Sequence, residues 1–351
     1  MKADKLLLHI GQPKTGTTTL QNCFWRSQDL LLAKGISNPQ VGPFKGNARL
    51  LGYHLLNDRR DDPLSRQTMG MDAKSAVALS GKRWEEICRD VAQGDLRKVV
   101  LSTEQFFEVH TAENIGQLNA ETAKVAETRE IIIYLRAPHR LLLSHLQQRL
   151  KREKSRLLDI GHPVTDVIAP LAQHWDGTIA LRVFDRNVLE GGDIVTDFMT
   201  AFCPEMPADM MRRGPRDDNT SMSSEAIAVL LDVKAGKLDH PRDYQTLATE
   251  VRRADKLTPG GTQPRLRDDV TQAFIHHSAP DLLCLRDTYG LTFPDIDYDD
   301  MDPCKADKRL LAFDAAEQFC TVDAARKAEI FRIARQRTAM PAILRRWLAR
   351  Y

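Results

Sequence analysis

The chain of 351 residues lacks several features that would point to particular classes of protein. Its formal net charge is only +2, so no excess of one sign favours nucleic acid or a membrane surface as a partner. Its six cysteines form no CxxC pair and show no metal-ligand spacing with histidine. There is no apolar run of about 20 residues, and the start MKADK is unlike a secretory signal. These absences favour a reduced, cytoplasmic protein without a nucleic-acid partner or a transmembrane segment.

The sequence contains instead short apolar runs that alternate with helical patterns. Four runs predict strands covered on both faces, at residues 5–10, 98–102, 130–135 and 179–184. Helical patterns lie between and after them, at residues 17–34, 84–93, 113–127, 138–154, 163–174 and 193–202. This alternation predicts an α/β fold with a P-loop-like open parallel sheet flanked by helices. No strong strand pattern follows residue 215, so the fold is expected to end in a helical C-terminal extension.

Two segments are not part of that alternation. Residues 36–80 are rich in Gly, Pro, Asn and Asp, and predict loops with one or two short helices. Residues 326–351 carry eight Lys or Arg and one Glu, which fits a solvated or packed helical face better than a docking helix or a membrane-surface element. We therefore expect an α/β domain over residues 1–300, with its motif-bearing core at about 5–200, and a basic helical extension over residues 301–351.

The stretch LLLHIGQPKTGTTTLQ, residues 6–21, predicts an anion-binding loop. The loop Gly11–Gly16 joins the first strand to a helix, and free backbone N–H groups and the helix dipole favour an anion there. Lys14 adds a positive charge, and Thr15, Thr17 and Thr18 add hydroxyl donors.

This loop differs from the GxxxxGK[ST] loop that binds nucleoside triphosphates. Gly11 and Gly16 have the required separation, but Thr17 follows and the lysine lies inside the loop. The strand at residues 98–102 is followed by Thr103 and Glu104, and not by an aspartate that would bind Mg²⁺. Both differences count against an ATP-dependent small-molecule kinase, which remains the alternative on this fold.

Two motifs resemble the sulfotransferases that use 3′-phosphoadenosine 5′-phosphosulfate (PAPS). PKTGTT after a strand resembles their 5′-phosphosulfate loop, and YLRAPHRLLLS supplies Arg136 and, eight residues later, Ser144, like the pair that binds the 3′-phosphate. The resemblance covers about residues 5–200 and includes bacterial members with a loop HIGxPKTGTT and a strand LRVFDR. Cytosolic animal members also bind the 3′-phosphate with a glycine-rich basic segment late in the chain. This sequence has no equivalent segment, and Arg265 or Arg267 are the candidates to replace it.

The resemblance implies PAPS as co-substrate, and no metal. It also implies that Lys14 stabilises the leaving phosphate, and that the 5′-phosphosulfate is bound by Thr15, Gly16, Thr17 and Thr18. The 3′-phosphate would be bound by Arg136 and Ser144.

Three further residues are candidates for contact with the acceptor. Glu104 follows a strand at the active edge, is placed like the catalytic glutamate of carbohydrate sulfotransferases, and could take the acceptor proton. Alternatively it caps the following turn or pairs with Lys14 or an arginine. His9 and His54 could reach the site, but a core role for His9 and a surface or packing role for His54 are favoured.

The sequence therefore predicts an enzyme that moves a sulfuryl group from PAPS to a hydroxyl, or an amine, of a carbohydrate, glycolipid or small-molecule acceptor. A non-catalytic nucleotide-binding protein on the same fold is the second alternative. Residues 36–80 and 215–265 are expected to form the acceptor pocket, since such pockets are built from loops. The acceptor and the formation of a homo-oligomer are left open.

Overall fold

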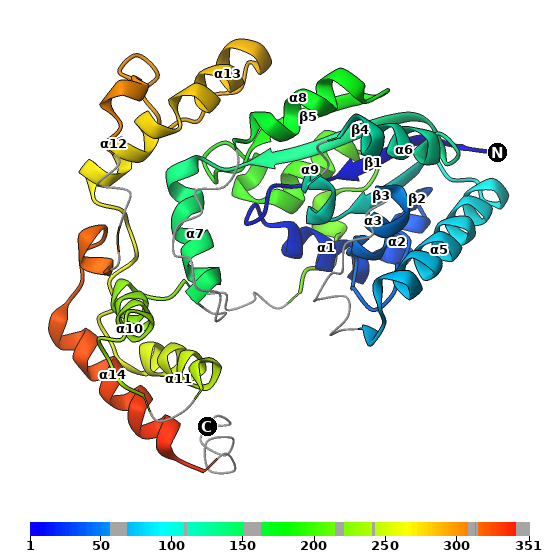
Figure 1. The fold of residues 1–351 in the computed structure, drawn as a ribbon. Helices are drawn as coiled ribbons and strands as arrows, with labels where there is room; N and C mark the ends of the chain where they lie inside the picture. Colours follow the sequence, from blue (N-terminus) through cyan, green and yellow to red (C-terminus); the bar gives the residue numbers. More distant parts are fainter. Residues whose placement is uncertain are drawn as a thin grey trace. The chain divides into compact units, whose positions relative to one another are not determined.

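The computed structural model describes residues 1–56, 69–108, 111–150, 163–214, 221–240, 243–307, 313 and 315–341. Contacts divide the chain into two compact units, which Figure 1 shows as ribbons. Unit 1 comprises Met1–Arg136, His162–Asp217 and Cys284–Pro294, and unit 2 comprises Ala137–Gly161, Asp218–Leu283 and Asp295–Tyr351. The expected domain boundary at residue 300 stays a prediction.

Unit 1 contains a parallel sheet of five strands, which confirms the predicted α/β class. The strands are β1 (Ala3–His9), β2 (Ile36–Ser37), β3 (Lys98–Ser102), β4 (Ala126–Leu135) and β5 (Thr178–Val183). Their order is β2-β3-β1-β4-β5, and every neighbouring pair is parallel. The central strand β1 therefore marks the point where the chain turns from one half of the sheet to the other.

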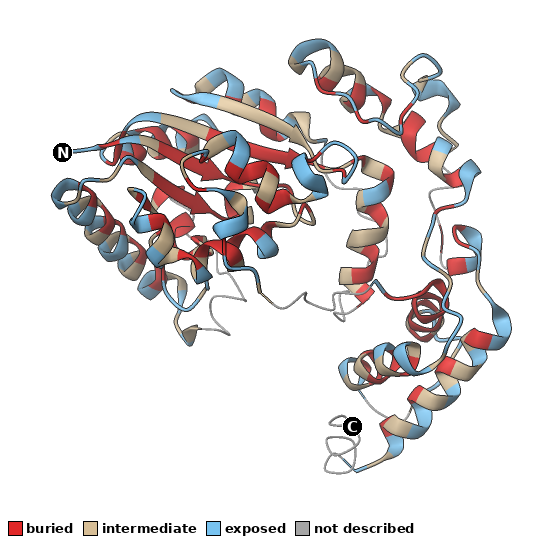
Figure 2. Cartoon of the chain, turned by 180° about the vertical axis from the view of Figure 1, so that it is seen from behind, coloured by how far each residue is buried: buried red, intermediate tan, exposed pale blue. Residues whose placement is uncertain are grey.

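The sheet is covered on both faces, as the continuous apolar runs predict. Leu6, Leu7 and Leu8 of β1 are all fully buried, although successive side chains point to opposite faces. On one face, Leu7 belongs to a core with Phe24 of α1 and Phe198 of α9. Burial differs between the strands: β1 and β3 are mostly buried, whereas the edge strand β5 is intermediate (Figure 2).

The helices of unit 1 follow the predicted order with shifted ends, except that the helix expected over residues 17–34 is divided into two at Ser27. They are α1 (Thr17–Arg26), α2 (Gln28–Leu32), η1 (Arg49–Leu51), α3 (Gly52–Leu55), α5 (Ala73–Gln93), η2 (Glu104–Glu108), α6 (Ala112–Thr122), α8 (Thr165–His174), η3 (Glu190–Gly192), α9 (Ile194–Phe202) and η4 (Ala208–Met210). Helix α5 begins 11 residues before the expected start at residue 84, because the Asp72 carboxylate accepts a hydrogen bond from the Ser75 N–H and caps it.

Unit 2 is helical, as expected for residues after 215. Its elements are α7 (Pro138–Leu150), α10 (Ser224–Lys234), α11 (Tyr244–Leu257), α12 (Asp268–His277), η5 (Pro303–Lys305), η7 (Ala316–Gln318) and α14 (Ala324–Ala339), while α13 (Ala279–Tyr289) runs across the boundary of the units. An isolated antiparallel bridge joins Leu266 to Cys320. The end predicted for the long helix, near residue 154, lies outside the described residues.

A buried arginine connects three helices of unit 2. Arg326 of α14 is 7% exposed and donates to the Glu225 carboxylate of α10 at 2.8 Å and to the Asp255 carboxylate of α11 at 2.8 Å. It also donates to the backbone oxygens of Thr258 and Pro259. The basic helix α14 thus packs through one face, in agreement with the packed interpretation of the C-terminal charges. In the described part of the chain, no helix is long and apolar enough to cross a membrane.

Candidate active site

The candidate site lies at the carboxyl edge of the sheet in unit 1. His9, the last residue of β1, is in register with Ser102 of β3 and with Ile132 of β4. Because neighbouring strands are parallel, the segments that follow them emerge at the same edge. The loop after β1, Glu104 after β3 and Arg136 after β4 therefore come from adjacent strands at a topological switch point, where ligands bind in open α/β sheets.

The loop between β1 and α1 has the backbone form of an anion-binding turn. Lys14 has φ 74° and Gly16 has φ 80°, and Lys14 is the only described residue other than glycine with positive φ. Left-handed residues in such turns direct successive N–H groups to one side, and Gly16 directly precedes the N-terminus of α1. The Thr15 hydroxyl donates to the Gln12 carbonyl at 2.6 Å and fixes the turn.

Close packing holds the end of the loop in place. A Cβ atom on Gly16 would lie 3.0 Å from the Phe184 ring and 3.2 Å from Ile194, so a larger residue would require these side chains to shift and would be strained at φ 80°. Thr15 and Thr17 are buried, while Thr18 is exposed and Lys14 is half-buried. The site therefore combines a fixed backbone with a lysine at its surface.

Arg136 is bonded to this loop through both its backbone and its side chain. Its N–H donates to the side-chain oxygen of Gln12 at 2.9 Å, and Nη1 donates to the Lys14 carbonyl at 3.3 Å. The guanidinium carbon lies 5.9 Å from the centre of the Phe184 ring. Two cationic residues far apart in the sequence are thus brought to one anion-binding loop.

Glu104 begins η2 and lies among groups that can interact with a carboxylate. Burial raises its pKa, and the Thr17 hydroxyl, Lys14 and Arg49 oppose that rise without cancelling it. The result is a pKa above the usual value for glutamate. A carboxylate with a raised pKa beside a cation suits the removal of a proton from an acceptor.

Ser102 fixes the segment that carries Arg49. Its carbonyl accepts from the Ala48 N–H at 2.9 Å and from the Gln21 side chain at 3.2 Å. A Cβ on Gly46 would lie 2.1 Å from the Gln21 carbonyl, so this segment runs in close contact with α1. The contacts place residues 46–52, part of the predicted acceptor region, beside the carboxyl end of β3.

Two buried polar atoms lie close to the loop: His9 Nε2, which has no hydrogen-bond partner among the described residues, and Thr17 Oγ1, whose interaction with Glu104 does not reach hydrogen-bond geometry. Both lie against Gly11, where a Cβ would be 2.8 Å from His9 Nε2 and 3.1 Å from Thr17 Oγ1. His9 is fully buried, Nδ1 lies 2.8 Å from Ser102 Oγ, and burial lowers the pKa of the imidazole to about 3. The imidazole is neutral, and the predicted core position of His9 agrees with its burial.

The other predicted residues have different surroundings. Ser144 lies in α7 of unit 2, and its role stays a prediction. His54 Nε2 contacts the Glu121 carboxylate at 3.2 Å, which agrees with the packing role favoured for it. Arg265 and Arg267, also in unit 2, pair with Asp268 at 3.6 Å and Asp269 at 2.8 Å.

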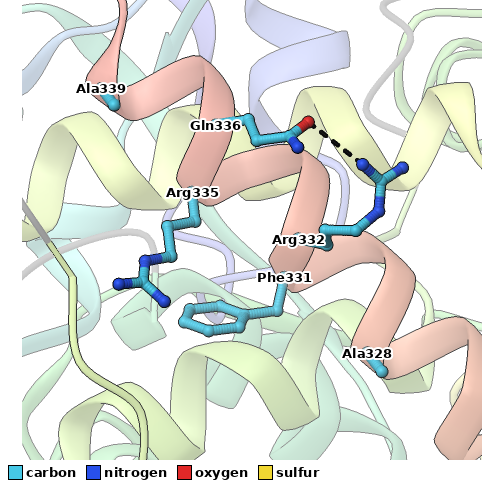
Figure 3. Close-up of a pocket in the computed structure, with 6 residues that line it drawn as sticks. All are labelled: Ala328, Phe331, Arg332, Arg335, Gln336 and Ala339. Carbon is cyan, nitrogen blue, oxygen red and sulfur yellow. Dashed lines mark hydrogen bonds between the residues drawn. The ribbon is translucent and has the colours of Figure 1, made fainter.

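A hollow of about 570 Å³ lies in unit 2, on one face of α14 (Figure 3). The lining side chains come from that helix alone: Ala328, Phe331, Arg332, Arg335, Gln336 and Ala339. They include no acid, histidine or nucleophile, so they offer no catalytic group. Across the residues that the structure describes, no cluster of three or more His, Cys, Asp or Glu could hold a metal ion.

Three polar contributors to the site were not predicted from the sequence: Gln12, Gln21 and Arg49. Gln12 lies between Gly11 and Pro13 and carries no signal of its own, because its role depends on the end of β4. Gln21 is one helical turn beyond Thr17, on the buried face of α1. Arg49 follows a Gly- and Pro-rich stretch whose path the sequence pattern does not determine.

No protein-family model matches the sequence, and a search of curated proteins finds no match. Among solved structures, the chain is similar to a sulfotransferase domain from the curacin biosynthetic pathway, with 12% sequence identity and a TM-score of 0.35. The similarity covers 59% of this chain and 77% of that domain. At this similarity, the functional assignment depends on the residues of the chain itself.

Proposed function

We propose that the protein is a PAPS-dependent sulfotransferase. The observation that carries this proposal is the arrangement of Lys14, Arg136 and Glu104 around one loop at the carboxyl edge of the sheet. The hydrogen bonds from Arg136 to Gln12 and to the Lys14 carbonyl support a single site with two cations. The donor has two anionic groups, a 5′-phosphosulfate and a 3′-phosphate, and we assign the loop to the first and Arg136 to the second.

In the proposed reaction the acceptor oxygen forms a bond to sulfur while the bond from sulfur to the bridging phosphate oxygen breaks. The acceptor proton passes to the Glu104 carboxylate, and the products are the sulfated acceptor and 3′-phosphoadenosine 5′-phosphate. Lys14 and the N–H groups of the loop stabilise the charge that develops on the leaving phosphate. Most of the catalysis then comes from positioning and electrostatics, as in phosphoryl transfer.

The same arrangement gives little support to phosphoryl transfer from ATP. The position after Gly16 is Thr17, whose hydroxyl is buried against Gly11, and the residue after Thr103 is Glu104, which lies beside Lys14 and Arg49. The acceptor is proposed to enter beside residues 46–52, next to Glu104. A hydroxyl of a carbohydrate, glycolipid or small metabolite would suit a carboxylate base there.

Calorimetric titration with 3′-phosphoadenosine 5′-phosphate, ATP, and ADP with Mg²⁺ tests the proposal. We expect micromolar binding of the bisphosphate without metal, followed by transfer of labelled sulfuryl from PAPS in an acceptor screen. Binding of ATP with Mg²⁺ but not of the bisphosphate would favour the kinase alternative. Binding of the bisphosphate without turnover on any acceptor pool would favour the non-catalytic one.

A further inference from the structure

The hydrogen bonds around Ser102 determine which nitrogen of His9 carries the proton. The Ser102 carbonyl can only accept, so the Gln21 atom facing it is the amide nitrogen, which also donates to Ser102 Oγ at 3.2 Å. Ser102 is fully buried, and within the described chain His9 Nδ1, at 2.8 Å, is the acceptor in reach of its hydroxyl proton. Nδ1 therefore accepts, and the neutral imidazole carries its proton on Nε2.

This N–H group is buried and directed at the start of the anion-binding loop. A Cβ on Gly11 would lie 2.8 Å from Nε2, so the absence of a side chain at Gly11 leaves the donor room. Thr17 Oγ1 lies 3.1 Å from the same point. The Thr17 hydroxyl interacts with Glu104, whose pKa it lowers, so the His9 N–H is the group left without any partner among the described residues. A buried N–H without a partner costs free energy unless a rearrangement on ligand binding supplies one.

We propose that His9 is a positioning residue of this site, whose Nε2–H donates to Thr17 Oγ1 when the loop binds its anion. The inference rests on the proposed function for the identity of the anion. Hydrogen bonds of active sites are often long without ligand and shorten when it binds. With its oxygen accepting from His9, the Thr17 hydroxyl must direct its own proton elsewhere, toward Glu104 or the bound anion. Burial keeps the imidazole neutral, so the direction of the hydrogen bonds from Ser102 through His9 to Thr17 does not depend on pH near neutrality.

NMR of the imidazole nitrogens tests the tautomer of His9 directly and requires no measurement of activity. The signals of His9 are assigned by their loss in His9→Gln. We expect a protonated Nε2 and a bare Nδ1, with no titration between about pH 5 and pH 9. A proton on Nδ1, or titration in this range, overturns the inference.

Binding of 3′-phosphoadenosine 5′-phosphate to a matched pair of variants tests the role. Glutamine and methionine have the same length, but only the glutamine amide can replace the Nε2–H donor. We expect His9→Met to weaken binding about tenfold and His9→Gln to stay within about threefold of the wild type. Equal affinities of the two variants, with both folded by circular dichroism, would contradict the role.

A double-mutant cycle tests whether His9 acts through Thr17. Thr17→Val removes the hydroxyl at constant shape and is expected to weaken binding about tenfold. His9→Met combined with Thr17→Val should be no weaker than the weaker single variant, because each removes the same hydrogen bond. If the double variant instead lost affinity by the product of the two single fold-losses, His9 would not act through Thr17. If the wild type does not bind the bisphosphate, the proposed function fails, and the inference is then decided by the tautomer and by the shift of Nε2 on addition of inorganic sulfate.

Discussion

The side-chain oxygen of Gln12 accepts the backbone N–H of Arg136 at 2.9 Å, although 124 positions separate the two residues in the sequence. This bond joins the end of β4 to the loop after β1. The guanidinium of Arg136 reaches the Lys14 carbonyl at the same place. In the proposed function, recognition of the two phosphate groups of one nucleotide would depend on two strands that are neighbours in the sheet.

The first prediction concerns discrimination of the 3′-phosphate. Arg136→Ala should weaken binding of 3′-phosphoadenosine 5′-phosphate about 10- to 100-fold, because a hydrogen bond to a charged group contributes about 1.5–3 kcal/mol. Binding of adenosine 5′-phosphate, which lacks the 3′-phosphate, should change little. Calorimetry with both nucleotides measures the difference. Arg129→Ala, near the other end of β4, is the control, and an equal loss for both nucleotides would exclude the assigned role.

The second prediction separates the charge of Lys14 from its backbone conformation. Lys14→Ala and Lys14→Gly both remove the ammonium group and should lower kcat about 10²–10³-fold. Since φ is 74° at this position, Lys14→Gly should be more stable than Lys14→Ala, by about 1 kcal/mol. Turnover and urea unfolding measure the two effects. Full activity in either variant would remove Lys14 from the mechanism.

The third prediction concerns the dependence of activity on pH. Because the pKa of Glu104 is raised, the carboxylate forms at higher pH than for an ordinary glutamate, and kcat/KM should fall as pH drops through that raised value. Glu104→Gln should lower kcat/KM about 10²–10⁴-fold and remove this acid limb. If the acid limb of the pH profile persisted in Glu104→Gln, another group would be responsible for it.

The raised pKa of Glu104 also affects the stability of the fold. As pH rises, activity is expected to increase, whereas stability is expected to decrease. A carboxyl with a raised pKa contributes stability below its ordinary pKa and loses it as pH rises through the folded value. Near neutral pH, therefore, the buried charge of Glu104 is unfavourable to folding. Glu104→Gln should unfold at the same or a higher temperature than the wild type, whereas a structural ion pair would make it unfold lower.

The fourth prediction concerns acid unfolding of unit 2. Burial alone would raise the pKa of Glu225, but hydrogen bonds from Thr262 and the backbone N–H of Asp323 lower it from 4.5 to about 2. The stability from this carboxylate is present above pH 4.5 and is lost as pH falls toward 2. Fluorescence-detected unfolding of Glu225→Gln should accordingly show a weaker dependence on pH in that interval.

Removal of the partner of that carboxylate should be more harmful. Arg326→Met leaves the buried Glu225 and the partly buried Asp255 without their cation and should cost about 3–5 kcal/mol. Arg332→Met, on the exposed face of the same helix, is the matched control and should cost less than about 1 kcal/mol. Similar losses for both variants would show that the buried network adds little.

The fold was predictable where local pattern and tertiary structure agree. The apolar runs of β1, β3 and β4 are buried on both faces, so each was visible in the sequence as a continuous run. The run of β5 was equally visible, although its side chains are only partly buried because it is an edge strand. The two-residue strand β2 was missed because Ile36 and Ser37 are too short a pattern to distinguish from a loop. The predicted helix over residues 113–127 is shorter, ending at Thr122, because β4 begins at Ala126 to pair with Ala3.

The site was predictable only as far as its motifs. Lys14 and the threonines follow one another in the sequence, and the parallel sheet brings Glu104 and Arg136 to the same edge. The contacts of Gln12 with Arg136, and of Ser102 with His9, depend on register across three strands. No spacing within a single segment carries that information, so these contacts emerged only from the folded chain.

The position of β1 in the sheet has a consequence for dynamics. Its backbone is hydrogen-bonded to β3 on one side and to β4 on the other, and its leucines are fully buried. The amide hydrogens of β1 should thus exchange with solvent only by the opening of unit 1 as a whole, whereas those at Lys14 and Gly16 can exchange through local motion. Binding of the proposed anion should then slow exchange in the loop and leave exchange in the strand beneath it unchanged.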